Sequence, residues 1–162
     1  VIQGIAYGAD LPVVPVSTLR ALAQRAYTEY QATKVLSAFD ARMNEVYFGA
    51  FELDPDALMQ PVIDEMVIKP DALEINLNES GPIGSTWVES GWIGSGSGWA
   101  VYEMQLSNSI AMELKQVFPD MITRADEIAV LAVPDFKQGK AVNAEQALPI
   151  YLRNEVAWKK SS

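Results

Sequence analysis

Two short stretches of the sequence carry residue types that could bind a phosphate group. In the first, Asp40 ends a predicted strand and is followed by the turn residues Ala41, Arg42 and Met43. An aspartate at this position can hold a magnesium-bound phosphate, but the phosphate must approach the backbone closely, and this favours glycines after the aspartate. None of the three turn residues is a glycine. The pattern therefore favours the alternative, a hairpin turn in which Asp40 and Arg42 pair.

The second stretch is the glycine-rich run from Gly94 through Gly96 to Gly98. Alternating glycines can present backbone N–H groups to an anion, or let a nucleotide base approach the chain. The run lacks the Lys-Ser/Thr ending of a phosphate-binding P-loop, and its spacing is not that of the dinucleotide fingerprint. A flexible loop between Trp92 and Trp99 explains the same residues, so the sequence leaves both interpretations open.

The composition excludes several classes of active site. The 162 residues contain no cysteine and no histidine, so a Ser-His-Asp or Cys-His triad, a His- or Cys-ligated zinc site and a disulfide scaffold cannot form. One group of carboxylates could hold Mg²⁺ or Ca²⁺, but its spacing is not that of a calcium loop and favours a solvated loop. These residues are Asp54, Asp56, Asp64 and Glu65. We therefore expect no metal site and no catalytic residue.

The charge distribution argues against direct binding of nucleic acid. The formal net charge is -9, and residues 45–113 contain twelve acidic residues and one basic residue, Lys69. Such a surface repels phosphates. The mildly basic end of the chain holds the expected zone of RNA contact, Arg153, Lys159 and Lys160. No stretch resembles a membrane span or a signal sequence, and the lack of cysteine fits a cytoplasmic protein.

Hydrophobic periodicity predicts alternating helices and strands. The clearest element is a helix over residues 18–30, capped by Ser17, whose apolar positions recur at helical spacing. They are Leu19, Leu22, Ala23, Ala26, Tyr27 and Tyr30. Residues 35–40 and 45–52 alternate as a hairpin with two apolar faces, which predicts a sheet covered on both sides. This is the pattern of an α/β fold with an antiparallel hairpin.

The other expected elements are shorter or less regular. Residues 1–7 are expected to be the end of a helix or strand, and a short helix is expected to be capped by Asp71. Further expected elements are strands over 13–16, 66–69 and 86–89, helices over 107–118 and 124–137, the second bent or ended by Pro134, and an extended tail over 148–158.

Four motifs, spread from residue 8 to residue 154, occur in the order typical of the bacterial TsaB (YeaZ) family. They are GADLP with VSTL (8–12 and 16–19), DAR with EVY (40–42 and 45–47), GSGW (96–99) and PIYLRN (149–154). The chain resembles this family over essentially its whole length, through the combination of motifs rather than through any single one.

The resemblance implies a fold and a function. Proteins of this family have the two-lobed actin/hexokinase/Hsp70-like (ribonuclease H-like) fold. They act as non-catalytic partners of a related subunit, TsaD, which carries the metal and the transferase site. Together with a small ATPase, TsaE, they install threonylcarbamoyl on the adenosine beside the anticodon of certain tRNAs. The expected role is thus an accessory scaffold without a cofactor. It would meet tRNA only indirectly and nucleotide only within the complex, and a homodimer is left open.

The resemblance also implies a division of the chain. The family's Gly-rich GPGSFTG segment would precede Val1, so the chain is expected to be a fragment. Residues 1–30 would then be a remnant of the N-terminal lobe, and residues 31–162 the C-terminal lobe. These proteins meet TsaD through helices of the N-terminal lobe, which makes one face of the helix over 18–30 the expected partner-binding site. The alternative is that this stripe packs inside the chain. The residues are Leu19, Leu22, Ala23, Ala26 and Tyr27.

The competing class of function is an enzyme of the same superfamily. A nucleotide hydrolase would use Asp40 and Arg42 together with Gly94, Gly96 and Gly98, residues that the scaffold interpretation makes a vestigial nucleotide site. A peptidase is the other form of this alternative, because older names for the family include glycoprotease.

Overall fold

The sheet is built on the predicted hairpin. Strands β1 (Lys34–Arg42) and β2 (Glu45–Leu53) pair antiparallel, from Lys34 opposite Glu52 to Arg42 opposite Glu45. Side chains alternate between the two faces of each strand, and both faces are apolar. The hairpin therefore sits at the centre of a sheet with a layer on each side.

The computed structural model describes residues 1–74, 91–110, 112–150 and 152. In the sheet, the strand order is β3-β2-β1-β5-β6, and β4 also pairs with β2. β5 runs parallel to β1 and to β6, whereas the pairs of β2 are antiparallel. The remaining elements are α1 (Ile2–Ala9), α2 (Thr18–Tyr30), β3 (Met59–Pro61), β4 (Met66–Ile68), η1 (Pro70–Ala72), β5 (Ile93–Ser95), α3 (Ser97–Ile110), β6 (Gln116–Phe118), α4 (Ala125–Lys137) and η2 (Ala144–Gln146).

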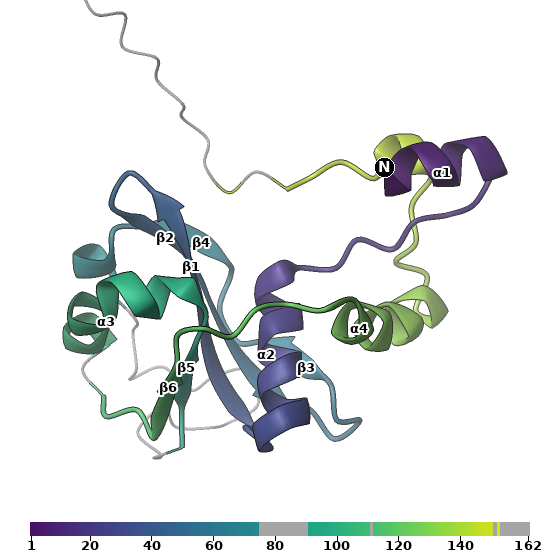
Figure 1. The fold of residues 1–162 in the computed structure, drawn as a ribbon. Coiled ribbons are helices and arrows are strands. Elements are labelled where there is room, and N and C mark those ends of the chain that lie inside the picture. The colour runs from purple at the N-terminus through teal and green to yellow at the C-terminus, as the bar shows by residue number, and fades with distance from the viewer. Residues whose placement is uncertain (75–90, 111, 151, 153–162) are drawn as a thin grey trace, which may run out of the picture.

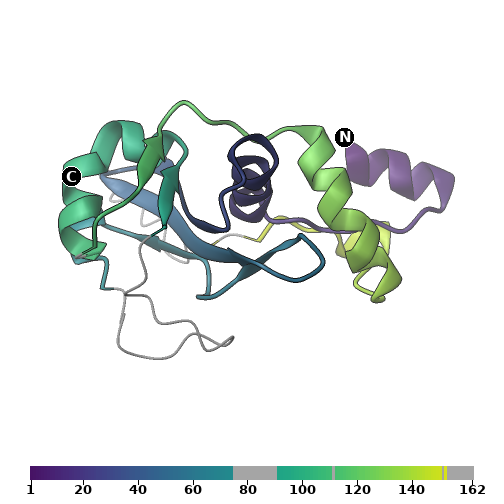
Figure 2. The same ribbon diagram turned by 90° about the horizontal axis from the view of Figure 1, so that it is seen from below.

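Helices cover both faces of the sheet, as the hairpin pattern predicts. On one face, α3 closes a core that includes Leu36, Phe48 and Trp99. On the other, α2 closes a second core that includes Leu22 and Phe51. Figures 1 and 2 show the sheet between these two helices. The prediction of a sheet covered on both sides is confirmed.

The helix over residues 18–30 forms with the predicted bounds. The Ser17 hydroxyl accepts a hydrogen bond of 3.3 Å from the Arg20 backbone N–H, so the predicted cap is present. Gln31 ends the helix in the left-handed conformation. The helix is buried along Leu19, Leu22, Ala23 and Ala26, against the second core.

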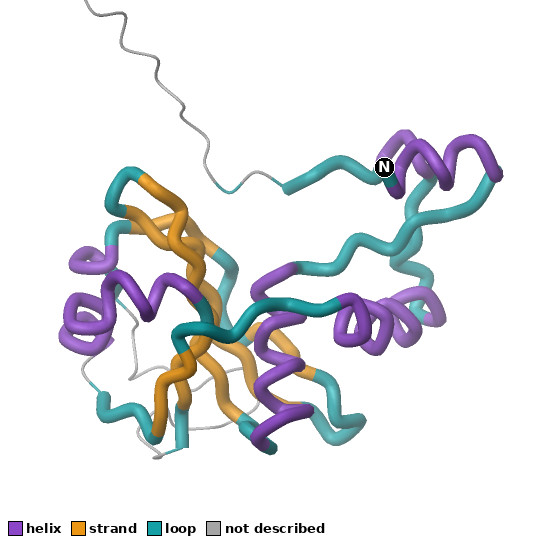
Figure 3. Tube along the Cα trace, in the orientation of Figure 1, coloured by secondary structure: helices purple, strands orange, loops and turns teal. Residues whose placement is uncertain are grey.

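A second group of elements lies beyond α2, away from the sheet. In Figure 3, α1, α4 and η2 stand together on the side of α2 opposite to α3. Contacts between α4 and α2, and an antiparallel bridge between Val13 and Val142, join this group to the rest of the chain. Within the described residues, no helix is long and apolar enough to cross a membrane.

Several predicted elements differ from the structure. The expected helix over 107–118 is wrong: α3 begins at Ser97 and ends at Ile110, and residues 116–118 form β6. The glycine run misled the prediction because glycines weaken helices, whereas Gly98 lies within the first turn of α3. Residues 13–16 make a single bridge at Val13 instead of a strand, and Asp71 lies inside η1, whose N-cap is Lys69.

Other predicted elements are confirmed, or lie outside the described residues. Residues 1–7 belong to a helix, α1, and the strand expected over 66–69 is β4. α4 has the expected bounds within one residue. Pro134 lies in its last turn and does not end the helix, which continues to Lys137. β3 was not predicted. The strand expected over 86–89 and most of the tail over 148–158 fall outside the described residues.

Candidate functional site

The turn after Asp40 is held together by its own residues. The Asp40 carboxylate accepts a hydrogen bond of 2.9 Å from the Arg42 backbone N–H, and its other oxygen lies 3.8 Å from the Arg42 guanidinium. The next two residues, Met43 and Asn44, continue the left-handed backbone of Arg42, with φ values of 56° and 60°. This matches the paired hairpin turn expected from the sequence, and the carboxylate is used in shaping it.

The structure brings the two predicted phosphate-type motifs together. The Asp40 backbone N–H donates a hydrogen bond of 3.2 Å to the hydroxyl of Ser97, which lies between Gly96 and Gly98. The turn of the hairpin and the start of α3 are therefore neighbours. Residues 57 positions apart in the sequence meet here because β1 and β5 are adjacent parallel strands whose carboxyl ends lie at the same edge.

The glycines of the run pack against protein. A Cβ atom on Gly98 would lie 2.8 Å from the Ala38 Cβ, and one on Gly96 would lie 2.5 Å from the Ala38 carbonyl oxygen. At Gly94 it would lie 2.7 Å from the Trp99 ring. Gly96 also has a φ of 99°, which favours glycine. The flexible loop, one of the two interpretations that the sequence left open, is wrong: Gly94 lies in β5 and Gly98 in α3, and the absence of side chains lets α3 approach β1.

The apolar stripe of α2 belongs to the core of this chain. Leu22, Ala23 and Ala26 have no exposed surface, and Leu19 is 2% exposed. They pack with Val35, Phe51, Met59 and Ile93 of the sheet. Of the five residues predicted to bind a partner, Tyr27 is half-buried, and it packs against the same core. The stripe therefore packs inside the chain, which is the alternative to partner binding that the sequence analysis left open. It does so because α2 covers one face of the sheet.

The expected acidic cluster divides into two structural roles. Asp54 organises the turn between β2 and β3: one carboxylate oxygen accepts hydrogen bonds of 2.9 Å from the backbone N–H groups of Asp56 and Leu58, and the other accepts 2.7 Å from Gln60. Glu65 accepts a hydrogen bond from the Ser17 hydroxyl. Within the described part of the chain, no three acidic side chains gather in a way that could hold a metal ion.

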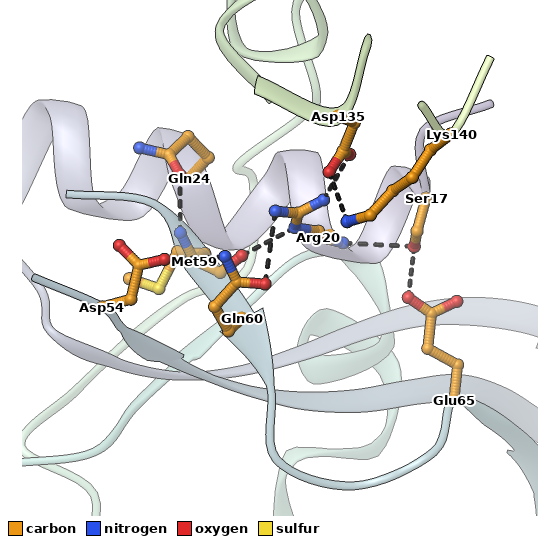
Figure 4. Close-up of polar contacts among 9 residues, drawn as sticks. All are labelled: Ser17, Arg20, Gln24, Asp54, Met59, Gln60, Glu65, Asp135 and Lys140. Carbon is orange, nitrogen blue, oxygen red and sulfur yellow. Dashed lines mark hydrogen bonds and ion pairs between the residues drawn. The ribbon is translucent and has the colours of Figure 1, made fainter. Parts of the chain in front are cut away.

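A buried polar network that the sequence did not reveal joins α4 to α2 and β3 (Figure 4). Its centre is Arg20, which donates to the Met59 carbonyl at 2.6 Å and to the Asp135 carboxylate at 2.7 Å. Lys140 donates to the other Asp135 oxygen at 2.6 Å. Gln24 accepts 2.8 Å from the Met59 backbone N–H, beside this network. Arg20 and Asp135 are 115 residues apart, so no local pattern could have paired them.

Two cations keep the Asp135 carboxylate charged in this network. Burial disfavours the charged form, but the hydrogen bond from Lys140 and the positive charge of Arg20 more than offset it, so the pKa of Asp135 lies below its ordinary value. In contrast, burial raises the pKa of Glu127, which lies on the same buried side of α4 as Asp135. The network is thus a structural ion pair that fixes α4 against α2.

One cavity lies beside this junction. It has a volume of about 430 Å³, and apolar side chains that include Val16, Leu19, Phe39 and Tyr47 line it. Two of its polar lining residues, Ser17 and Glu65, are hydrogen-bonded to each other. The lining comes from the start of α2 and the chain before it, from the sheet and from residues 148–150 and 152, so spacing in the sequence gave no signal of it.

The chain has relatives among known proteins. The profile of the family described as "TsaD: tRNA N6-adenosine threonylcarbamoyltransferase" matches residues 1–161. The chain is 34% identical to the tRNA threonylcarbamoyladenosine biosynthesis protein TsaB of Escherichia coli over 159 residues, which are 98% of the chain and 64% of that protein. TsaB of Haemophilus influenzae matches with the same identity and the same coverage. The chain thus spans a little under two thirds of the length of these relatives.

Solved structures give the same result. A crystal structure from Pseudomonas aeruginosa, described as similar to the peptidase YeaZ, superposes with a TM-score of 0.78 at 34% identity and covers 94% of this chain and 64% of that one. YeaZ from the same organism superposes with a TM-score of 0.78 at 33% identity, covering 93% of this chain and 64% of that one. The predicted actin-like α/β fold is confirmed, while the division into lobes at residue 30 stays a prediction. The chain belongs to the TsaD family, and the members it is similar to are the TsaB (YeaZ) proteins.

Proposed function

We propose that this protein is an accessory subunit in the biosynthesis of threonylcarbamoyladenosine in tRNA. In this role it acts in the cytoplasm, does no chemistry itself, and supports a catalytic TsaD-like subunit together with a TsaE-like ATPase. Its similarity to TsaB proteins at 34% identity over 98% of the chain supports the pathway. The direct contact with tRNA falls to the partners, because the acidic stretch over residues 45–113 repels phosphates.

The observation that carries the non-catalytic role is how the fold uses its two phosphate-type motifs. The Asp40 carboxylate accepts a hydrogen bond from the Arg42 backbone N–H in its own turn. Ala38 occupies the space beside Gly96 and Gly98. A phosphate site needs a free carboxylate for the metal and glycines that face the ligand. Here the carboxylate shapes its own turn and the glycines let α3 pack against β1, which supports a scaffold rather than a nucleotide hydrolase.

Reconstitution of the tRNA modification tests this proposal. TsaD-like and TsaE-like subunits, tRNA and the small-molecule substrates are incubated with and without the chain, and threonylcarbamoyladenosine is measured by mass spectrometry of digested tRNA. We expect the modification to depend on the chain and to be unchanged by Asp40→Asn, which keeps an oxygen to accept from Arg42. Product formation without the chain would contradict the accessory role.

ATP hydrolysis by the chain alone separates the scaffold from the competing enzyme. We expect no turnover above background for the wild type, and the same result for Asp40→Asn. Turnover that Asp40→Asn abolishes would overturn the non-catalytic role and promote the hydrolase, even if the modification assay still depended on the chain.

A further inference from the structure

A partly exposed aromatic pair lies where the end of α2 meets the edge strand of the sheet. The ring of Tyr30, the last residue of α2, stacks on the ring of Phe118 in β6, with centroids 4.1 Å apart and planes inclined by 25°. Phe118 packs against the core beneath α2, whereas Tyr30 is 52% exposed. One side of the Tyr30 ring is therefore fixed by Phe118, and much of the remaining ring surface faces solvent.

A cavity adjoins this pair. Its volume is about 250 Å³, and three charged residues line it beside the two rings: Arg25, Glu29 and Asp120. The Arg25 guanidinium donates hydrogen bonds of 2.9 Å to the Glu29 carboxylate and 2.6 Å to the Ile122 carbonyl. The charge of Arg25 is thus balanced by Glu29, within the same helix.

The third charged group of the cavity has no counter-ion. Asp120 is exposed, and its carboxylate has no hydrogen-bond or ion-pair partner in the part of the chain that the structure describes. The cavity therefore combines a net negative charge with an open aromatic ring. A ligand that satisfies both groups must carry a positive charge and a flat surface.

An arginine side chain has both properties. Its guanidinium is planar, so it can stack on a tyrosine ring, which attracts its positive charge. Its N–H groups can at the same time donate to a carboxylate such as that of Asp120. A nucleic-acid base could also stack on Tyr30, but its phosphates would meet Asp120 and a chain of net charge -9. The charge favours a cationic protein side chain.

We propose that the Tyr30 pocket (Tyr30, Phe118 and Asp120) receives an arginine of a partner protein, whose guanidinium stacks on Tyr30 and pairs with Asp120. The identity of the partner rests on the proposed function, in which the other subunits contact tRNA directly and need cationic surfaces to bind its phosphates. Tyrosine and arginine are also enriched among the residues that dominate the binding energy of protein interfaces.

Titration with short peptides tests the pocket without any partner protein. The whole chain is titrated with acetyl-Gly-Arg-Gly-amide, and with acetyl-Gly-Lys-Gly-amide for comparison, while the ring signals of Tyr30 are followed by NMR. Asp120→Asn removes the carboxylate charge, and Asp71→Asn is the matched control because Asp71 is another exposed aspartate. We expect the arginine peptide to shift the Tyr30 signals more than the lysine peptide does. Asp120→Asn should weaken its binding about threefold, and Asp71→Asn should leave it unchanged.

Binding of the partner subunits tests whether a partner uses the pocket. The affinity of the chain for TsaD-like and TsaE-like subunits is measured by calorimetry for the wild type, Tyr30→Ala, Asp120→Asn and Asp71→Asn. Circular dichroism checks that the variants fold. We expect Tyr30→Ala to weaken binding about tenfold and Asp120→Asn about fivefold, with Asp71→Asn unchanged.

The two experiments separate the pocket from the proposed function. Subunit binding that is equally tight for all variants would overturn the proposal and leave the accessory role standing. If the wild type binds neither subunit, the proposed function is contradicted and the peptide titration decides on the pocket by itself. Tyr30 signals that do not move, or that move equally with both peptides, would overturn the proposal. A shift caused by tRNA and not by the arginine peptide would assign the ring to a base instead.

Discussion

Apolar side chains are buried on the sheet side of α2, whereas beyond its other side several of them are exposed. On the sheet side, Leu22 and Trp99 point from their helices into closed cores and are fully buried. On the other side, α4 turns Leu131 and two carboxylates inward and leaves Val133 exposed. Helices α2 and α4 were both predicted from the helical spacing of their apolar residues. The comparison teaches that periodicity tells which residues share a face, but not what that face meets.

The means of attachment differ as well. The sheet region is held by two apolar cores, whereas α4 is joined to α2 by the ion pair of Arg20 with Asp135. α1 is tied to η2 by a hydrogen bond of 2.9 Å from Gln3 to the Ala144 carbonyl. Regions with few buried apolar contacts open at lower free energy than the core does. We therefore expect the α1 and α4 region to open locally while the sheet stays folded.

The largest effect is expected from a charge in the α2 core. Leu22→Asp places an unpaired carboxylate at a position with no exposed surface, so we expect a loss of at least about 4 kcal/mol and unfolding of the sheet region. Urea denaturation followed by circular dichroism measures it. A folded Leu22→Asp variant of normal stability would show that the stripe lies at the surface, and the stripe would again be a candidate partner-binding site.

Breaking the ion pair should affect α4 more than the sheet. Asp135→Asn removes a charged acceptor of Arg20 and Lys140, so we expect the docking of α4 to lose about 1.5–3 kcal/mol. Hydrogen exchange should speed up in α4, while the amides of β1 and β2 keep their protection. Equal acceleration in both regions would show that they unfold as one unit.

Two glycines allow a direct comparison of the regions. Gly98→Ala brings a Cβ atom to 2.8 Å from Ala38, so we expect overpacking to cost about 1–3 kcal/mol. Gly4→Ala in α1 meets nothing within 4 Å and should stabilise that helix by about 0.5–1 kcal/mol. Thermal unfolding of the two variants measures the difference. A stabilising Gly98→Ala would mean that the start of α3 is open to a ligand.

Acid should release α4 before it unfolds the sheet. The pKa of Asp135 is lowered in the folded chain, so its contribution is fully present above the ordinary pKa of an aspartate, about 4, and is lost as the pH falls through the lower folded value. The protection factors of the α4 amides, measured from pH 6 down to pH 3, should fall at the acid end in the wild type. The Asp135→Asn variant, already lacking this contribution, should show no such step.

The smallest effect is expected on the outer side of α4. Val130 is 50% exposed, and a lysine can lay its methylene groups over the same surface, so Val130→Lys should cost at most about 1 kcal/mol. Chemical denaturation of the chain alone measures it. A cost as large as that of Leu22→Asp would show that the outer side is already covered within this chain.

Local chemistry was sufficient to predict the hairpin and two of the helices. Alternating apolar residues fixed the faces of β1 and β2, Ser17 marked the start of α2, and the spacing of apolar residues gave α4 within one residue. These features depend on a residue's near neighbours, which the sequence displays directly. The pairing of Asp40 with Arg42 is equally local, since two positions separate them.

The sequence by itself determined the absence of cysteine and histidine chemistry, the acidic charge and the order of motifs that places the chain beside TsaB. The tertiary structure alone decided the rest. It decided that Gly98 serves the approach of α3 to Ala38, that the α2 stripe faces the chain's own sheet, and that Arg20 meets Asp135 across 115 residues. The physical reason is that burial and ion pairing depend on which distant segments come together, and that information is carried by the packing of the whole chain.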